Sequence, residues 1–216
     1  ELHPDESIDS ILMLSEYLNA PILADPTSNI RYNEIHKNII SSYNFLLRNI
    51  NIKPNYIIRF GRKPTSKILC NLISENSNVL LVDKYELFND NPKEFIRANL
   101  DNFKNYIIKS FNSIDHNLIL NTLIKSQEKM NSHINGFTID EMMCEGILIK
   151  DILNIVKPNT NLFIGNSMAI REMDDLTINM NKKINVYSNR GASGIDGLVS
   201  TALGMSSASQ SKNNIA

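Results

Sequence analysis

Short apolar runs alternate with segments of helical spacing along most of this chain. Residues 7–18 carry apolar side chains at the three- and four-residue spacing of an amphipathic helix, and a short apolar run at 21–26 closes in a turn. The alternation predicts an α/β fold with a Rossmann-like parallel sheet flanked by helices, because parallel strands need helical crossovers between them. We expect further strands at 56–60, 79–83, 161–165 and 184–187, helices at 33–48, 64–75 and 168–176, and a mainly helical section at 92–157 in which Thr138 to Glu141 offers a capping-box start.

In such a sheet, ligands bind beyond the carboxyl ends of the strands, in the loops that lead into helices. The first of these loops is RFGRKPTSK, residues 59–67. Gly61 ends the strand and Pro64 suits a first helical turn, so basic side chains gather at a helix start that favours anions. A P-loop is excluded, because Ser66 stands where its second glycine belongs and Ile68 follows the lysine. From these residues alone, a solvated basic turn remains an equal interpretation.

The second loop is GNSMAIR, residues 165–171. Gly165 gives a tight turn, and Asn166 or Ser167 is predicted to cap the helix that follows. Ser167 and Arg171 are four residues apart, so they share a helical face and a common ligand is possible. The planar fork of arginine suits a carboxylate better than lysine does. An ordinary helix cap with an exposed arginine explains the same pattern.

The third loop is SNRGASGIDG, residues 188–197. Its glycines, Gly191, Gly194 and Gly197, relieve crowding where a loop enters a helix, and Arg190 precedes them without an adjacent acidic residue. The spacing differs from the dinucleotide pattern G-x-G-x-x-G. Three glycines leave room for a ligand close to the backbone, and Arg190 adds a positive charge beside them. This combination favours a binding loop over a turn that serves only packing.

Composition excludes several classes of function. The chain has 22 Lys and Arg against 23 Asp and Glu, so no overall basic field exists to hold nucleic acid. Its apolar runs are too short to span a bilayer. Cys70 and Cys144 are far apart and match no metal-ligand spacing, as expected of a reduced, cytoplasmic compartment, or the plastid stroma if the gene is plastid-encoded. The chain starts at Glu1 and stops at 213–216, where an apolar run begins, so we expect a piece of a longer protein.

Two of these loops together resemble a known family. GNSMAIR, followed at 186–204 by VYSNRGASGIDGLVSTALG, is similar to the 2-succinyl-5-enolpyruvyl-6-hydroxy-3-cyclohexene-1-carboxylate synthases, thiamine diphosphate enzymes of menaquinone and phylloquinone biosynthesis. PILADPTSNIR at 21–31 and IIRFGRKPTSK at 57–67 resemble other parts of the same family in the same order. The resemblance implies a transferase that decarboxylates 2-oxoglutarate and adds the remaining carbanion to isochorismate.

The family implies a domain order and cofactors. Residues 1–180 would be its central Rossmann-like domain, and residues 181–216 the start of the C-terminal diphosphate-binding domain. Thiamine diphosphate with Mg²⁺ or Mn²⁺ is expected, with the catalytic glutamate and the metal ligands outside this chain, which alone would be inactive. A homo-oligomer, a dimer or tetramer, is expected of the full-length protein, with no nucleic acid partner and no integral membrane segment.

The resemblance also assigns site residues, by match of motif. Arg171 and Arg190 fall on catalytic and substrate-binding positions, Ser167 and Lys67 on substrate-binding positions, and Ile195 on a cofactor-contacting position. Ile68 stands where the family often has a second basic residue. Two alternatives remain: an acetolactate-synthase-like thiamine diphosphate enzyme, which usually lacks SNRGASGIDG, and a non-catalytic Rossmann-like module, which would need a dinucleotide glycine pattern.

Overall fold

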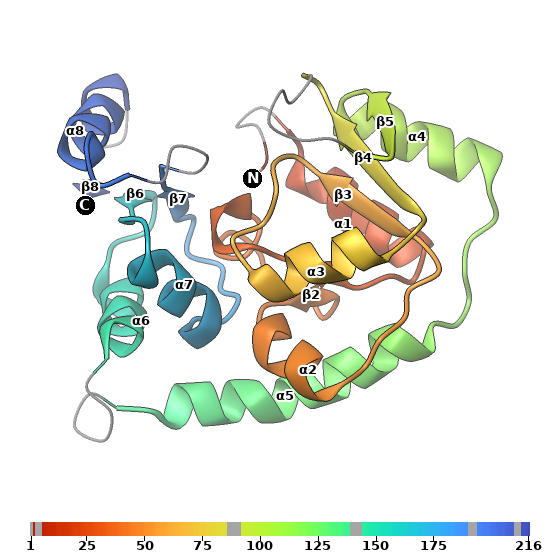
Figure 1. Ribbon diagram of the computed structural model, residues 1–216, viewed down its shortest axis with the longest axis horizontal. Coiled ribbons are helices and arrows are strands. Elements are labelled where there is room, and N and C mark those ends of the chain that lie inside the picture. Colours follow the sequence, from red (N-terminus) through yellow and green to blue (C-terminus); the bar gives the residue numbers. More distant parts are fainter. Residues whose placement is uncertain (1, 3–5, 86–91, 139–143, 190–193, 210–212) are drawn as a thin grey trace.

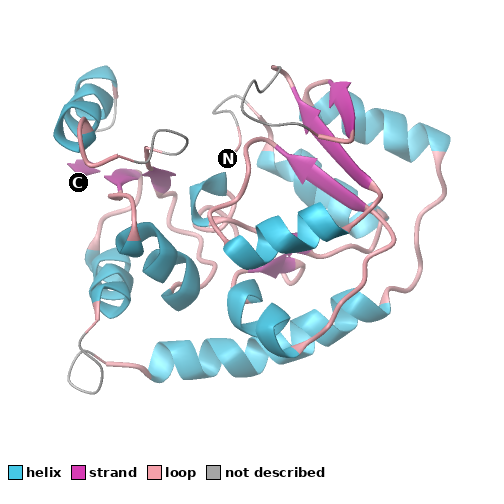
Figure 2. Cartoon of the chain, viewed as in Figure 1, coloured by secondary structure: helices cyan, strands magenta, loops and turns pink. Residues whose placement is uncertain are grey.

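The structure is a computed structural model of the 216-residue chain, and it describes residues 2, 6–85, 92–138, 144–189, 194–209 and 213–216. All strand pairs in these residues are parallel, and helices flank the strands (Figure 2). The predicted α/β class with parallel sheets is therefore confirmed. The strands fall into two groups, with the long helix α5 (Leu118–Gly136) running beneath both (Figure 1).

The first group of strands occupies the N-terminal half of the chain. β1 pairs with β2, and β4 lies between β3 and β5 in a separate sheet. Buried apolar side chains such as Ile39, Tyr43 and Val82 hold the helices against these strands, since removing apolar surface from water is the main driving force of packing. The elements are α1 (Ile8–Tyr17), β1 (Ile22–Leu23), the 3₁₀ helix η1 (Pro26–Ser28), β2 (Ile39–Ile40), α2 (Tyr43–Asn49), β3 (Ile57–Phe60), α3 (Lys67–Glu75), β4 (Val79–Asp83), β5 (Glu94–Arg97) and α4 (Leu100–Ser110).

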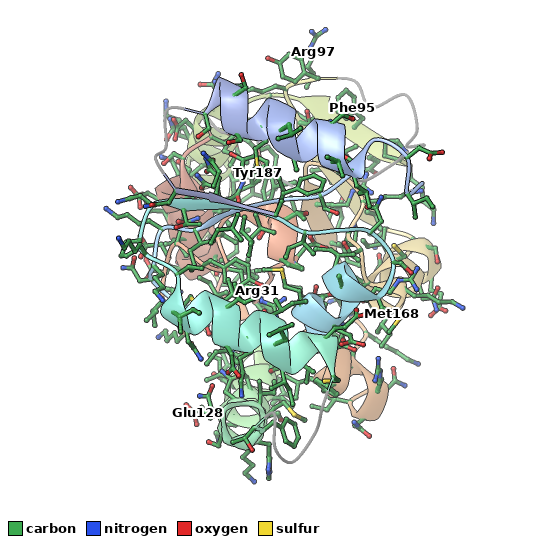
Figure 3. The ribbon with its side chains drawn as sticks, turned by 90° about the vertical axis from the view of Figure 1, so that its left-hand side faces the viewer. Arg31, Phe95, Arg97, Glu128, Met168 and Tyr187 are labelled. Atoms are coloured by element: carbon green, nitrogen blue, oxygen red, sulfur yellow. The ribbon has the colours of Figure 1, made fainter. Side chains whose placement is uncertain are left out.

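The second group forms a sheet in the order β7-β6-β8. Its strands run between α8 on one face and α6 and α7 on the other (Figure 3). Leu153, Ile170, Met173 and Ile184 are fully buried in the core between α6, α7 and the strands. The elements are α6 (Glu145–Ile155), β6 (Thr160–Phe163), α7 (Met168–Leu176), β7 (Asn185–Tyr187), α8 (Leu198–Ala208) and β8 (Asn213–Ile215).

One segment of the first group borders the second sheet. The side-chain oxygen of Asn29 accepts from the Val186 amide at 3.0 Å, along β7. The backbone oxygens of Arg31 and Tyr32 accept from Met180 and Lys182, at 2.9 and 3.0 Å. The end of the PILADPTSNIR motif therefore connects the two groups of strands.

The predicted helix at 33–48 is wrong in its first half. Ile35, Ile39 and Ile40 have helical spacing, but Ile39 and Ile40 are both fully buried as strand β2, and Ile35 is exposed. The side chain of Gln127 on α5 bonds the backbone oxygen of Ile39 at 2.8 Å and the Ser41 amide at 2.6 Å. Long-range backbone pairing thus overrides the local pattern, and only α2 remains helical.

The section predicted as mainly helical opens with β5, an edge strand whose residues are all exposed. The predicted capping box starting at Thr138 falls largely outside the described residues, and α6 begins at Glu145. Among the described residues, no helix has both the length and the apolar character needed to cross a membrane.

Candidate functional site

The three loops singled out in the sequence all follow the carboxyl ends of parallel strands. Residues 61–66 connect β3 to α3, residues 164–167 connect β6 to α7, and the third loop begins where β7 ends. β6 and β7 are hydrogen-bonded neighbours, with Phe163 opposite Tyr187. The second and third loops therefore leave the same edge of one sheet, where ligands of α/β proteins bind.

Asn166 joins the second and third loops directly. Its side-chain nitrogen donates to the backbone oxygen of Gly194 at 3.1 Å, and its side-chain oxygen accepts from Ser188 Oγ at 3.3 Å. Arg190, assigned from sequence to this site, lies outside the described residues. The described residues on both sides of it are thus tied to the start of α7.

Ser167 has a backbone conformation that L-residues rarely adopt, with φ 70° and ψ −124°. It stands at the N-cap position of α7, but its side chain makes no capping hydrogen bond. The predicted side-chain cap is therefore wrong for both candidates, because Asn166 turns toward Ser188 and Gly194 instead. Such strain costs about 1–3 kcal/mol and concentrates at functional sites. The Ser167 hydroxyl is left exposed at the strand ends.

Arg171 and Lys67 are exposed cations near the starts of two different helices. Arg171 lies in the first turn of α7, and Lys67 is the first residue of α3. Within the described residues, neither side chain has an ion-pair partner. No carboxylate of the described residues neutralises either charge, and both cations stand where helix dipoles favour an anion.

Ile195 is an exposed apolar side chain on the third loop. It is 83% exposed and stands between Gly194, which accepts the Asn166 bond, and Asp196. Gly197, with φ 81°, then brings the chain into α8, a conformation that glycine adopts without steric cost. Ile195 therefore presents an apolar side chain to solvent between Gly194 and the start of α8.

A buried polar network lies between the two cation-bearing helices, centred on the Asp174 carboxylate of α7. Arg31 Nη1 donates to Asp174 Oδ1 at 2.7 Å, and the Tyr43 hydroxyl donates to the same oxygen at 2.5 Å. Asn44 Nδ2 donates to Asp174 Oδ2 at 2.8 Å. Arg31 is fully buried, and Figure 3 shows it in the interior of the molecule. It also donates to the backbone oxygens of Asp174 and Thr177.

The pKa values of this network follow from its burial. Burial raises the pKa of Asp174, and the neighbouring Arg31 charge lowers it. Burial also raises the pKa of Tyr43 well above its ordinary value, so its hydroxyl is a hydrogen-bond donor. Burial opposes the charge of Arg31, but Tyr32 and Asp174 raise its pKa overall. Every side chain bonded to the Asp174 oxygens is thus a donor, as an ionised carboxylate requires.

The network extends to the basic turn before α3. Ser66 Oγ donates to the side-chain oxygen of Asn44, and accepts from the Leu69 amide at 3.1 Å as the N-cap of α3. The buried carboxylate of Asp25 accepts from the Thr65 amide at 2.7 Å. The start of α3 is therefore fixed from two sides.

These buried residues were missed in the sequence. Arg31 closes the PILADPTSNIR motif, and its place in that motif is the one signal the sequence offers. Asp174 and Asn44 sit among ordinary helical residues, and nothing local sets them apart. Among the described residues, no three His, Cys, Asp or Glu side chains group as metal ligands would.

Comparison with known proteins gives the family. No protein-family model matches the chain. A curated relative from Bacillus pumilus is 31% identical over 94% of this chain, and one from Oceanobacillus iheyensis is 31% identical over 93%. A relative from Desulfitobacterium hafniense is 34% identical over 90% of this chain. All three are named 2-succinyl-5-enolpyruvyl-6-hydroxy-3-cyclohexene-1-carboxylate synthase.

The predicted membership of this synthase family is confirmed. The chain spans 37%, 37% and 36% of the lengths of these three synthases. It thus corresponds to one segment of a synthase, and the segment includes all the loops described above. The assignment of individual residues within it stays a prediction.

Proposed function

We propose that this chain is part of a synthase that removes carbon dioxide from 2-oxoglutarate and adds the remaining four-carbon unit to isochorismate, a step toward menaquinone or phylloquinone. The observation that carries the proposal is the similarity to synthases of this name over 90–94% of the chain. The two groups of strands, with candidate anion-binding residues at their carboxyl ends, agree with it.

The proposed cofactor is thiamine diphosphate with Mg²⁺ or Mn²⁺. Bound thiamine diphosphate supplies the electron sink through which a 2-oxo acid loses carbon dioxide. The exposed Ile195 fits this group, because an apolar side chain beside a tethered glycine loop suits an uncharged ring. We place the metal ligands and the cofactor-activating glutamate in other parts of the synthase.

The proposed substrate-binding residues are Lys67, Ser167, Arg171 and Arg190, with both arginines acting in catalysis. Both substrates carry carboxylates next to the reacting carbons, so a site must hold anions in a fixed orientation. Arginine does this with paired N–H donors, while lysine acts as a point charge. We assign Arg171 and Arg190 to orient the carboxylate nearest the reaction, Lys67 to attract a more distant one, and the Ser167 hydroxyl to donate to substrate oxygen.

The wider organisation is also proposed. As the family resemblance implies, a boundary near residue 180 would separate a central domain from the C-terminal diphosphate-binding domain. It would run through one sheet, since β6 and β7 on either side of it pair with each other. The full-length synthase would be a cytoplasmic or plastid homo-oligomer.

Substitution of Lys67 tests the substrate-binding assignment. In the full-length protein, we expect Lys67→Ala to raise KM for one acidic substrate about tenfold while kcat changes little, because a distant cation contributes mainly uniform binding. Steady-state kinetics with each substrate varied in turn would measure this. Lys129→Ala, at an exposed lysine of α5, is the control and should leave both constants unchanged. An unchanged KM in Lys67→Ala would contradict the assignment and favour the alternative, in which the basic turn is solvated and binds no substrate.

A further inference from the structure

Asn44 connects the two helices that carry the proposed cations. It lies in the first turn of α2 and is only 6% exposed. Its side-chain oxygen accepts a hydrogen bond from Ser66 Oγ, and its side-chain nitrogen donates to Asp174 Oδ2 at 2.8 Å. Ser66 immediately precedes Lys67, and Asp174 lies about one helical turn after Arg171. One side chain therefore joins the start of α3 to the body of α7.

Position 44 requires an acceptor on one side and a donor on the other. The acceptor takes the Ser66 hydroxyl, and the donor satisfies a buried carboxylate oxygen. An aspartate here would place a second negative charge against Asp174. An apolar residue would leave the Ser66 hydroxyl hydrogen without its acceptor and remove a donor from the buried Asp174 Oδ2, which is costly. Within this short reach, the asparagine amide meets both requirements.

The two ends that Asn44 joins are themselves held rigidly. Ser66 caps α3 through the Leu69 amide, and the preceding Thr65 amide is fixed by Asp25. Asp174 is fixed by Arg31 and by the Tyr43 hydroxyl. Because both ends are held in place, the Asn44 side chain fixes the start of α3 relative to α7. A link to a flexible end would not do so.

We propose that Asn44 is a positioning residue that sets the spacing between Lys67 and Arg171. The inference rests on the proposed function, in which these cations bind substrate carboxylates. A substrate held at two points loses affinity and orientation when the spacing between the points changes, even if both charges remain. Asn44 would thus act on the substrate only through the two helices it joins.

A double-mutant cycle in the full-length protein tests this role. We expect Asn44→Ala to raise KM for the acidic substrate that Lys67 binds. We also expect Lys67→Ala to raise that KM about tenfold in the wild-type background but about threefold or less in the Asn44→Ala background, because a misplaced lysine has less binding to lose. Equal factors in the two backgrounds, with both variants folded, would overturn the proposal. Asn49→Ala, an exposed asparagine on the same helix, should leave the Lys67 factor at its wild-type value.

Hydrogen exchange provides a readout that does not depend on activity. In Asn44→Ala, amides in the first turn of α3 should exchange about tenfold faster, because the Ser66 side chain that caps the helix is no longer held by its hydrogen bond to Asn44. Unchanged exchange there would show that Asn44 does not hold α3 and would also overturn the proposal. If Asn44→Ala fails to fold, Ser66→Ala breaks the same link from its other end, and the same cycle with Lys67→Ala applies.

The cycle separates failure of this inference from failure of the proposed function. If Lys67→Ala has no effect in the wild-type background, Lys67 does not bind substrate, and the proposed site fails with the inference. If Lys67→Ala has its expected effect and Asn44→Ala leaves that effect unchanged, the proposed site stands and the positioning role alone is wrong.

Discussion

Asp174→Asn should destabilise the region around α7 by about 3–5 kcal/mol, because it leaves the buried Arg31 guanidinium without a negative partner. The asparagine amide cannot replace the carboxylate, since Oδ1 accepts from Arg31 and Tyr43 and Oδ2 accepts from Asn44. In either orientation, its NH₂ group would face a donor. Hydrogen exchange of the full-length protein should show amides of α7 opening about two to four orders of magnitude more often.

The neighbouring aspartate provides a matched control. Asp175 is also on α7, and its ion pair with Arg48 is longer, at 3.7 Å, with the Arg48 side chain 53% exposed. Surface pairs of this kind contribute at most about 1 kcal/mol, so Asp175→Asn should change exchange of α7 little. If both variants behaved alike, the charge of Asp174 would not be needed to hold Arg31.

Arg171→Lys should lower kcat/KM of the full-length synthase about 10- to 100-fold while the protein still folds, because lysine keeps the charge but loses the paired donors. Arg171 is exposed on the first turn of α7, so the change leaves the core intact. Steady-state kinetics and melting temperature should be measured on one preparation.

Arg48→Lys is the control for this change. Arg48 is an exposed arginine of α2 whose carboxylate partner, Asp175, belongs to the protein itself. We expect it to keep kcat/KM within about twofold of wild type. An Arg171→Lys variant that melts earlier but keeps wild-type kinetics would assign Arg171 a purely structural role.

The sequence predicts best the elements whose pattern is local. The bounds of α7 were predicted from its periodicity, and β3, β4, β6 and β7 from short apolar runs. β5 was missed because all its residues are exposed at the edge of a sheet, which leaves no apolar pattern to read. β2 was misread because strand pairing overrides the helical spacing of Ile39 and Ile40.

The site likewise has residues that local motifs predict and residues that only the folded chain brings together. Motif resemblance singles out Lys67, Ser167, Arg171, Arg190 and Ile195, and the structure describes all of these except Arg190. The network behind them depends on contacts between distant residues, such as Arg31 with Asp174, 143 positions apart. The strained φ of Ser167 is equally invisible in sequence, because it arises where the chain must turn from β6 into α7.

The most direct test of the account is an assay of the full-length protein with 2-oxoglutarate, isochorismate, thiamine diphosphate and Mg²⁺. We expect one carbon dioxide released for each isochorismate consumed, an adduct with the mass of isochorismate plus the four-carbon unit, and no reaction when thiamine diphosphate is omitted. Turnover of pyruvate to acetolactate, with isochorismate left unchanged, would contradict the account and favour an acetolactate-synthase-like enzyme.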